Sequence, residues 1–175
     1  ERLGTYLGAH FELGTATDLP WADRSMDVCL MPELLEHIAD WQRTLAECVR
    51  VLRPGGALFL STTNRLCPRQ NEFRVPFYSW YPSWVKRRCE RLAVTSWPWL
   101  ANYATYPAVN WFSYPELMAE VQHRGFQVFD RFDLAALRGM DGWKGWVIRL
   151  LSGTPALRYC GYLASPSSLL IGVRR

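Results

Sequence analysis

Apolar and polar positions along the first third of the chain predict strands and helices in alternation. Residues 26–31 (MDVCLM) form an apolar run of strand length. Asp40 is a candidate N-cap for a helix over residues 41–52, whose apolar side chains fall on one face. Pro54-Gly55-Gly56 then ends the helix, and residues 57–61 (ALFLS) have the continuous apolar character of a strand buried in a parallel sheet. This succession predicts a strand–helix–strand unit.

Further elements are predicted on both sides of this unit. Ser113 and Glu116 have capping-box spacing and open a helix that is expected to end at Gly125. A chain of 175 residues has the length of a single domain, so all of these elements are assigned to one domain over residues 1–175. The other expected elements are the end of a helix over residues 1–7, a short strand over residues 11–13, a strand over residues 126–132 and a last strand over residues 169–173.

Residues 64–111 break this regularity and are rich in aromatic side chains. They hold five of the nine tryptophans, and one short helix is expected within them, over residues 80–92. We interpret the segment as a lid inserted into the domain, and its aromatic content favours an apolar or aromatic small molecule as partner. The basic residues 86–88 and Arg91 have two explanations: peripheral contact with a membrane through an amphipathic helix, or the solvated face of a helix packed on a core.

Composition excludes several classes of protein. Hydrophobic residues make up 49% of the chain and charged residues 21%, which are ordinary globular values. No apolar run approaches the ~20 residues of a membrane-spanning helix, and no secretion signal is visible, so a cytoplasmic location is expected. The five cysteines contain no C-x-x-C pair and are expected to be reduced thiols. The net charge of +4 comes mostly from scattered bases, so no nucleic-acid partner is expected.

Three segments, at residues 14–27, 35–38 and 47–61, resemble class I S-adenosylmethionine (SAM)-dependent methyltransferases in order and spacing. Their sequences are GTATDLPWADRSMD, LEHI and ECVRVLRPGGALFLS, and residues 61–65 (STTNR) are similar to the end of the matching strand in ubiquinone-type O-methyltransferases. The resemblance implies an α/β fold with a Rossmann-like, mostly parallel sheet and flanking helices. It also implies SAM as cofactor and methyl transfer to a small acceptor.

The resemblance places candidate cofactor residues at the carboxyl ends of two strands, where open parallel sheets bind their ligands. Thr15 and Ala16 match the loop that contacts the adenine, although the family usually has aspartate at the position of Thr15. Leu30, Met31 and Pro32 match the strand end that lines the cofactor. On chemistry alone, Thr15 is equally compatible with the start of a turn, and Met31 with ordinary hydrophobic packing.

The segment Glu33-Leu-Leu-Glu36-His37 carries the candidate catalytic chemistry. His37 is a candidate general base that would deprotonate an acceptor hydroxyl, because imidazole titrates near neutral pH. In ubiquinone-type relatives a similar segment is linked to a divalent cation, so Glu33, Glu36 and His37 are also candidate ligands. No metal is assigned, since Glu36 has the simpler alternative of bracing the loop.

The sequence lacks the family's glycine-rich loop after the first strand and the acidic residue after the second. We therefore expect the chain to match the family without its first strands, and its own activity to be in doubt. Three alternatives stay open. They are a non-catalytic relative that acts as a partner protein, a nicotinamide-dependent oxidoreductase, which would need a G-x-G-x-x-G motif that is absent, and a peripheral membrane-binding module.

Overall fold

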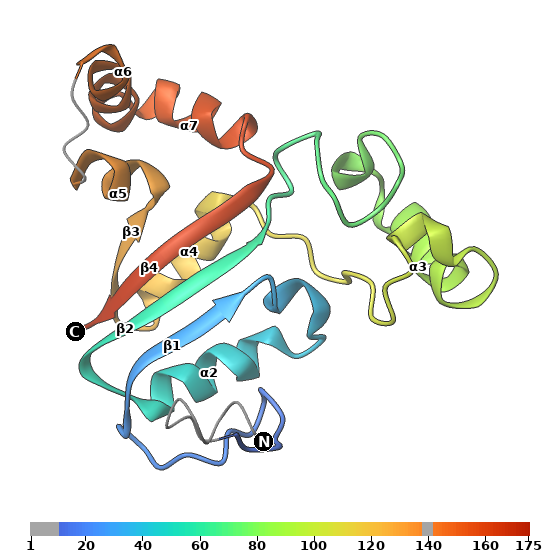
Figure 1. Ribbon diagram of the computed structural model, residues 1–175, viewed down its shortest axis with the longest axis horizontal. Helices are drawn as coiled ribbons and strands as arrows, with labels where there is room; N and C mark the ends of the chain where they lie inside the picture. The colour runs from blue at the N-terminus through green and yellow to red at the C-terminus, as the bar shows by residue number, and fades with distance from the viewer. Residues whose placement is uncertain (1–10, 138–141) are drawn as a thin grey trace.

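The computed structural model describes residues 11–137 and 142–175, and within them four strands form one sheet in the order β1-β2-β4-β3 (Figure 1). β1 pairs with β2 in parallel, whereas β4 is antiparallel to both β2 and β3. The sheet is therefore mixed, and the expectation of a mostly parallel sheet is wrong. The strands are β1 (Met26–Pro32), β2 (Leu52–Thr63), β3 (Phe126–Asp130) and β4 (Ser167–Arg174).

The connection between β3 and β4 explains the antiparallel pairing. Three helices follow the carboxyl end of β3, and β4 begins beside that same end, since Asp130 pairs with Leu170 near the start of β4. For a parallel neighbour, the chain would have to cross back to the opposite end of the strands, which this connection does not do. The helices are α5 (Arg131–Leu137), α6 (Gly142–Gly153) and α7 (Pro155–Leu163).

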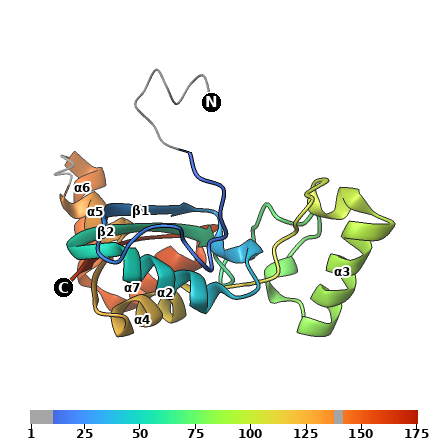
Figure 2. The same ribbon diagram turned by 90° about the horizontal axis from the view of Figure 1, so that it is seen from below.

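Two helices that lie on one side of the sheet confirm their sequence signals (Figure 2). In α2 (Trp41–Val51), the side chain of Asp40 accepts a hydrogen bond from the backbone N–H of Arg43, as an N-cap does. α4 (Tyr114–His123) begins with both hydrogen bonds of the capping box at Ser113. Behind it, Gly125 has a φ of 88°, a conformation that favours glycine.

Other expected elements differ from the structure. Residues 11–13 form no strand, and Phe11 and Leu13 are exposed, with no strand beside them to pair with. The strand expected over residues 126–132 ends at Asp130, because the carboxylate of Asp130 accepts the backbone N–H groups of Phe132 and Asp133 and starts a helix there. The helix expected over residues 1–7 lies outside the described residues.

The main hydrophobic core lies between the sheet and the helices α2, α4 and α7. Leu58 and Leu60 of β2 pack there against Leu45 and Leu117, and the rings of Tyr114 and Tyr162 stack at 3.8 Å. Burial of this apolar surface is the main stabilising term of such a fold. Along β2, fully buried residues alternate with half-buried ones, so one face of the strand is more thoroughly covered than the other.

Residues 65–111 form a lobe beside the sheet, beyond the carboxyl ends of β1 and β2 (Figures 1 and 2). The lobe starts and ends at adjacent points, because Asn64 forms a β-bridge with Phe112 and the N–H of Arg65 donates to the carbonyl of Phe112 at 2.8 Å. A second hydrophobic cluster fills it, with Phe73 stacked on Tyr78 at 4.1 Å. Its helices are α3 (Ser83–Thr95) and the 3-10 turns η2 (Tyr78–Trp80) and η3 (Pro98–Ala101).

Candidate functional site

A small apolar pocket lies between the loop before β1, the strand β1 itself and the helix α2. Its volume is about 210 Å³, and Ala16, Leu30 and Met31 all line it. Three of the five expected cofactor residues are thus brought together at one place. The other lining residues are Leu19, Trp21, Met26, Val28, Cys29, Leu34, Thr44, Cys48 and Val51. None of the lining side chains carries a formal charge at neutral pH, so the pocket suits a flat heteroaromatic group better than a charged one.

The loop residues Leu19 and Trp21 also line this pocket, although neither was among the predicted site residues. A signal was present, because Leu19-Pro20-Trp21 is an apolar island within an otherwise polar loop. Apolar residues of this kind in an exposed loop need a surface to pack against. Here that surface is the edge of β1 and α2.

Arg50 of α2 fixes this loop in place. Its guanidinium donates to the carbonyl oxygens of Leu19 and Trp21 at 2.9 and 2.7 Å and forms ion pairs with Glu47 and Asp23 at 2.8 Å each. The hydrogen bond from Arg50, together with the one from the backbone N–H of Leu19, lowers the pKa of Glu47 to about 2. The loop therefore keeps its path although it contains no helix or strand.

Thr15 and Pro32, the two remaining cofactor candidates, do not line this pocket. The carbonyl of Thr15 accepts from the N–H of Asp18 at 3.1 Å, and its hydroxyl is within 2.9 Å of the hydroxyl of Thr17. Thr15 therefore starts a tight turn, which was its alternative interpretation. Pro32 is exposed and ends β1 opposite Ser61.

Glu36 is the middle residue of the turn η1 (Leu35–His37) and is completely buried. Thr62 of β2 donates its hydroxyl to one carboxylate oxygen at 2.9 Å, and the other oxygen has no partner among the described residues. Burial raises the pKa of Glu36 to about 8, and the neighbouring carboxylate of Glu33 contributes to the rise. A protonated Glu36 at the end of β2 braces the turn, which agrees with its structural interpretation.

His37 lies in the same turn. Its Nδ1 atom is buried and has no hydrogen-bond partner among the described residues. The turn is held from the lobe's end, because the carbonyl of Glu36 accepts the N–H groups of Val109 and Asn110 at 2.8 and 3.0 Å. His37 does not line the pocket of Ala16, Leu30 and Met31.

The part of the chain that the structure describes contains no group of three His, Cys, Asp or Glu side chains placed to hold a metal ion. Glu33 and Glu36 are directed to different partners, since Glu33 accepts the hydroxyl of Ser61 at 2.7 Å and Glu36 accepts that of Thr62. Within the same described part, no helix is long and apolar enough to cross a membrane.

The basic residues of α3 do not form one continuous basic face. Arg87, Arg88 and Arg91 are exposed, but Lys86 is turned inward and buried. The helical spacing gave the signal for this, because Lys86 lies three and seven positions before Cys89 and Ala93, which face the lobe's interior. Lys86 is therefore not part of the basic face that a membrane-facing α3 would present, whereas the three arginines are.

Comparison with known proteins finds similarity to methyltransferases. Residues 2–60 match a family model described as a methyltransferase domain. The demethylmenaquinone methyltransferase of Tropheryma whipplei is 34% identical over 113 residues, which are 65% of this chain and 45% of that protein. The ubiquinone biosynthesis O-methyltransferase of Parvibaculum lavamentivorans is 35% identical over 81 residues, which are 46% of this chain and 32% of that protein.

Solved structures agree on the fold. A SAM-dependent methyltransferase from Mesorhizobium loti superposes with a TM-score of 0.55 at 15% identity, covering 95% of this chain and 70% of that one. One from Thermotoga maritima gives 0.52 at 19% identity, covering 99% and 68%. The chain spans less than half the length of the two relatives matched by sequence. The chain is thus similar in sequence to SAM-dependent methyltransferases over part of its length, and similar to them in fold over most of it.

Proposed function

We propose that the protein takes part in SAM-dependent methyl transfer to a small apolar or aromatic acceptor. The observation that carries this proposal is the apolar pocket at β1, in which Ala16, Leu30 and Met31 meet. SAM supplies an electrophilic methyl group on its sulfonium, and a protein that uses it chiefly has to position the two reactants. The pocket runs along β1 from Met26 to Met31, and it therefore reaches the carboxyl end of a parallel strand, where such sheets bind nucleotides.

The pocket fits one part of the cofactor. Its volume of about 210 Å³ is below the ~300–1,000 Å³ of sites for drug-sized ligands. An adenine ring is flat and largely apolar, and Met31 and Leu30 would hold it by packing against its faces. The charged amino-acid end of SAM finds no charged partner among the residues that line this pocket.

We also propose His37 as the base that accepts the acceptor's proton. A buried ring nitrogen without a partner requires an explanation, and a proton-accepting role supplies one. His37 lies in a turn that hydrogen bonds tie both to β2 and to the residues that close the lobe. The aromatic lobe favours an acceptor with an apolar body.

The direct test is calorimetric titration of the chain with S-adenosylhomocysteine. We expect saturable binding that is at least tenfold weaker in Ala16→Leu, whose larger side chain would fill the pocket. Ala119→Leu, at an exposed position on α4, is the matched control and should bind as the wild type does. No binding by the folded wild-type chain would refute a cofactor site at β1 and favour a non-catalytic partner role.

His37 requires a separate measurement. In a methyl-transfer assay with a phenolic acceptor, His37→Asn should lower kcat while leaving the affinity for S-adenosylhomocysteine unchanged. Loss of both, or of neither, would contradict the role of His37 as a base.

A further inference from the structure

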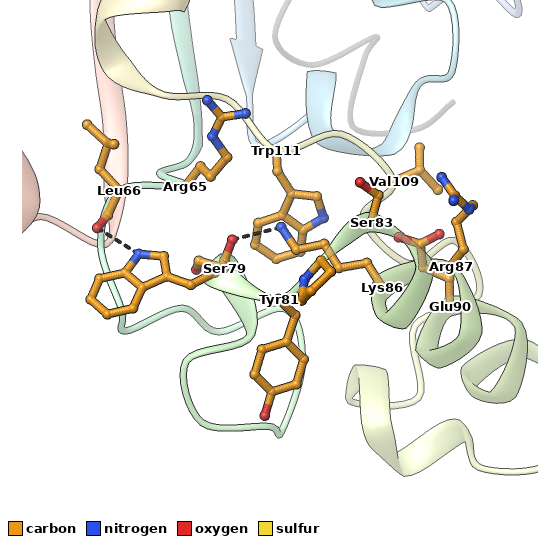
Figure 3. A pocket seen from close by; sticks show the side chains of 12 residues that line it. Arg65, Leu66, Ser79, Tyr81, Ser83, Lys86, Arg87, Glu90, Val109 and Trp111 are labelled. Atoms are coloured by element: carbon orange, nitrogen blue, oxygen red, sulfur yellow. Dashed lines mark hydrogen bonds between the residues drawn. The ribbon is translucent and has the colours of Figure 1, made fainter.

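A second pocket, inside the lobe, contains a group of hydrogen-bond donors that the protein itself does not satisfy. It has a volume of about 690 Å³ and lies between α3, η2 and residues 109–111, where the chain returns to the sheet (Figure 3). Its walls are partly aromatic, with Trp80, Tyr81 and Trp111 among the lining residues. It shares no lining residue with the apolar pocket at β1.

Lys86 is the central charged group of this pocket. Its side chain is 9% exposed, and its ammonium group donates one hydrogen bond, to the carbonyl oxygen of Ser79 at 2.7 Å. The same ammonium lies over the Trp111 ring, 4.7 Å from its centre, and Figure 3 shows the two side chains beside each other. An ammonium group has three N–H donors, so a buried Lys86 with one acceptor has donors left for a ligand.

Two further donors beside Lys86 are unsatisfied. The hydroxyl of Ser79 and the indole N–H of Trp111 are both buried and have no hydrogen-bond partner among the described residues. Ser79 is 2% exposed, so bulk water does not reach it freely. Buried polar groups are nearly always paired in folded proteins, and a set of unpaired ones in a single pocket indicates a ligand.

The charged side chains that line the pocket are mostly basic, as an anion site requires. Arg65, Lys86 and Arg87 line it together with a single acid, Glu90. Arg65 is held in place by an ion pair with Glu116 at 2.7 Å. Burial, and then the charge of Arg65, lower the pKa of Lys86 to about 8, whereas Glu90 opposes that change. An anion bound between Lys86 and Arg65 would stabilise the charged form of Lys86 and so oppose both the burial and the charge of Arg65.

We propose that this pocket binds the oxyanion of a small molecule with an apolar or aromatic body, such as a carboxylate or a phosphate ester. The oxyanion would accept hydrogen bonds from Lys86, Ser79 and Trp111. These donors are largely shielded from water, and hydrogen bonds to a charged acceptor are the strong ones in such a place. The body of the molecule would pack on the aromatic walls. The proposal does not depend on methyl transfer, because no cofactor is needed for the anion to bind.

The test uses the full chain labelled with ¹⁵N and no cofactor. Sodium benzoate, inorganic phosphate and the neutral analogue benzyl alcohol are titrated separately, and the indole N–H signals of Trp111 and Trp80 are followed. Trp111→Phe identifies the Trp111 signal. We expect benzoate to shift that signal saturably and to bind at least tenfold more tightly than benzyl alcohol. Saturable binding of phosphate as well would assign the site to phosphate esters, whereas binding of benzoate alone would assign it to carboxylates.

Substitutions then separate this pocket from general charge effects. Lys86→Met should weaken benzoate binding at least tenfold, and Arg88→Met, the same loss of charge on the exposed side of α3, should change it less than twofold. Trp111→Phe keeps an aromatic ring, although a smaller one, and removes the N–H, so it should weaken binding about tenfold when followed by the Trp80 signal. Equal affinity for benzoate and benzyl alcohol, or equal losses in Lys86→Met and Arg88→Met, would overturn the proposal. If Lys86→Met does not fold, the comparison of ligands and Trp111→Phe still decide it.

Discussion

At the scale of single residues, Glu36 couples the stability of the protein to pH. Its pKa is raised to about 8 in the folded chain, mainly by burial. An unfolded chain releases this proton near pH 4.5, so the folded state binds more protons between about pH 5 and pH 8, and stability falls as the pH rises through that range.

We expect Glu36→Gln to be more stable than the wild type at pH 8, by about 1–3 kcal/mol. Glutamine is always neutral and keeps an oxygen for the hydroxyl of Thr62. The measurement is urea unfolding at pH 5 and pH 8, where the gain should appear mostly at pH 8. Glu120→Gln, which alters a surface pair with Arg124, is the control. A gain that is the same at both pH values would show that Glu36 is ionised in the folded protein.

A second residue-scale prediction concerns Asp130 at the end of β3. It is fully buried, and Arg158 of α7 pairs with it at 2.8 Å. Arg158→Met leaves a buried carboxylate without its countercharge, so we expect a loss of about 3–5 kcal/mol in urea unfolding. Arg124→Met removes a surface ion pair with Glu120 and should cost less than about 1 kcal/mol. Similar losses in the two variants would refute this role of Asp130.

At the scale of elements, the loop before β1 depends on α2 for its position. Arg50 joins the two through the carbonyls of Leu19 and Trp21, and that loop supplies one wall of the apolar pocket.

Arg50→Met should therefore weaken binding of S-adenosylhomocysteine about tenfold, because the wall loses its anchor. Arg53→Met is the matched control, since Arg53 forms an ion pair with Asp27 and both side chains are largely exposed. Calorimetry measures both affinities. A loss in Arg53→Met as large as in Arg50→Met would indicate a charge effect and not an effect of the loop.

Elements with strong local signals were predicted well, and those that depend on distant partners were not. The Asp40 cap and the Ser113 capping box set helix starts through hydrogen bonds to residues three positions away. The direction of β4 is different, because it depends on where α5 to α7 return the chain, and no local pattern encodes that. None of the three helices was predicted, although the carboxylate of Asp130 caps the start of α5.

The candidate site shows the same division. The resemblance proposed Ala16, Leu30 and Met31 together, and they line one pocket because the loop that contains Ala16 packs beside β1. Lys86 was placed on a solvated face, although its helical spacing put it inside. Lysine side chains are rarely buried, so the residue type favoured a solvated position although the helical spacing favoured an inward one.

At the scale of the whole molecule, the protein has two hydrophobic clusters with no residue in common among those described. We propose that the lobe, together with the adjoining Asn64, is an insertion that folds onto its own cluster. The β-bridge between Asn64 and Phe112 means that its two ends need no long connection.

A chain in which residues 66–108 are replaced by six Gly and Ser residues tests this proposal. Such a linker spans up to about 20 Å, enough to rejoin the two ends. We expect it to unfold cooperatively on heating and to keep any binding of S-adenosylhomocysteine, while losing the benzoate site. A variant with the same linker inserted between Thr105 and Tyr106, which are exposed and lie outside the helices of the lobe, is the control. Loss of cooperative unfolding in the deletion variant would show that the lobe is part of the main folding unit.

The pairing of β2 with β4 also bears on how the chain folds as it is made. Ala57 pairs with Val173, more than 100 positions later in the sequence. At the ~5–20 residues per second of protein synthesis, β2 waits roughly 5–20 s for this partner. During that time one edge of an apolar central strand is open to other chains. The sheet closes only when the last strand leaves the ribosome, so the newly made protein is most prone to aggregation just before its synthesis reaches β4.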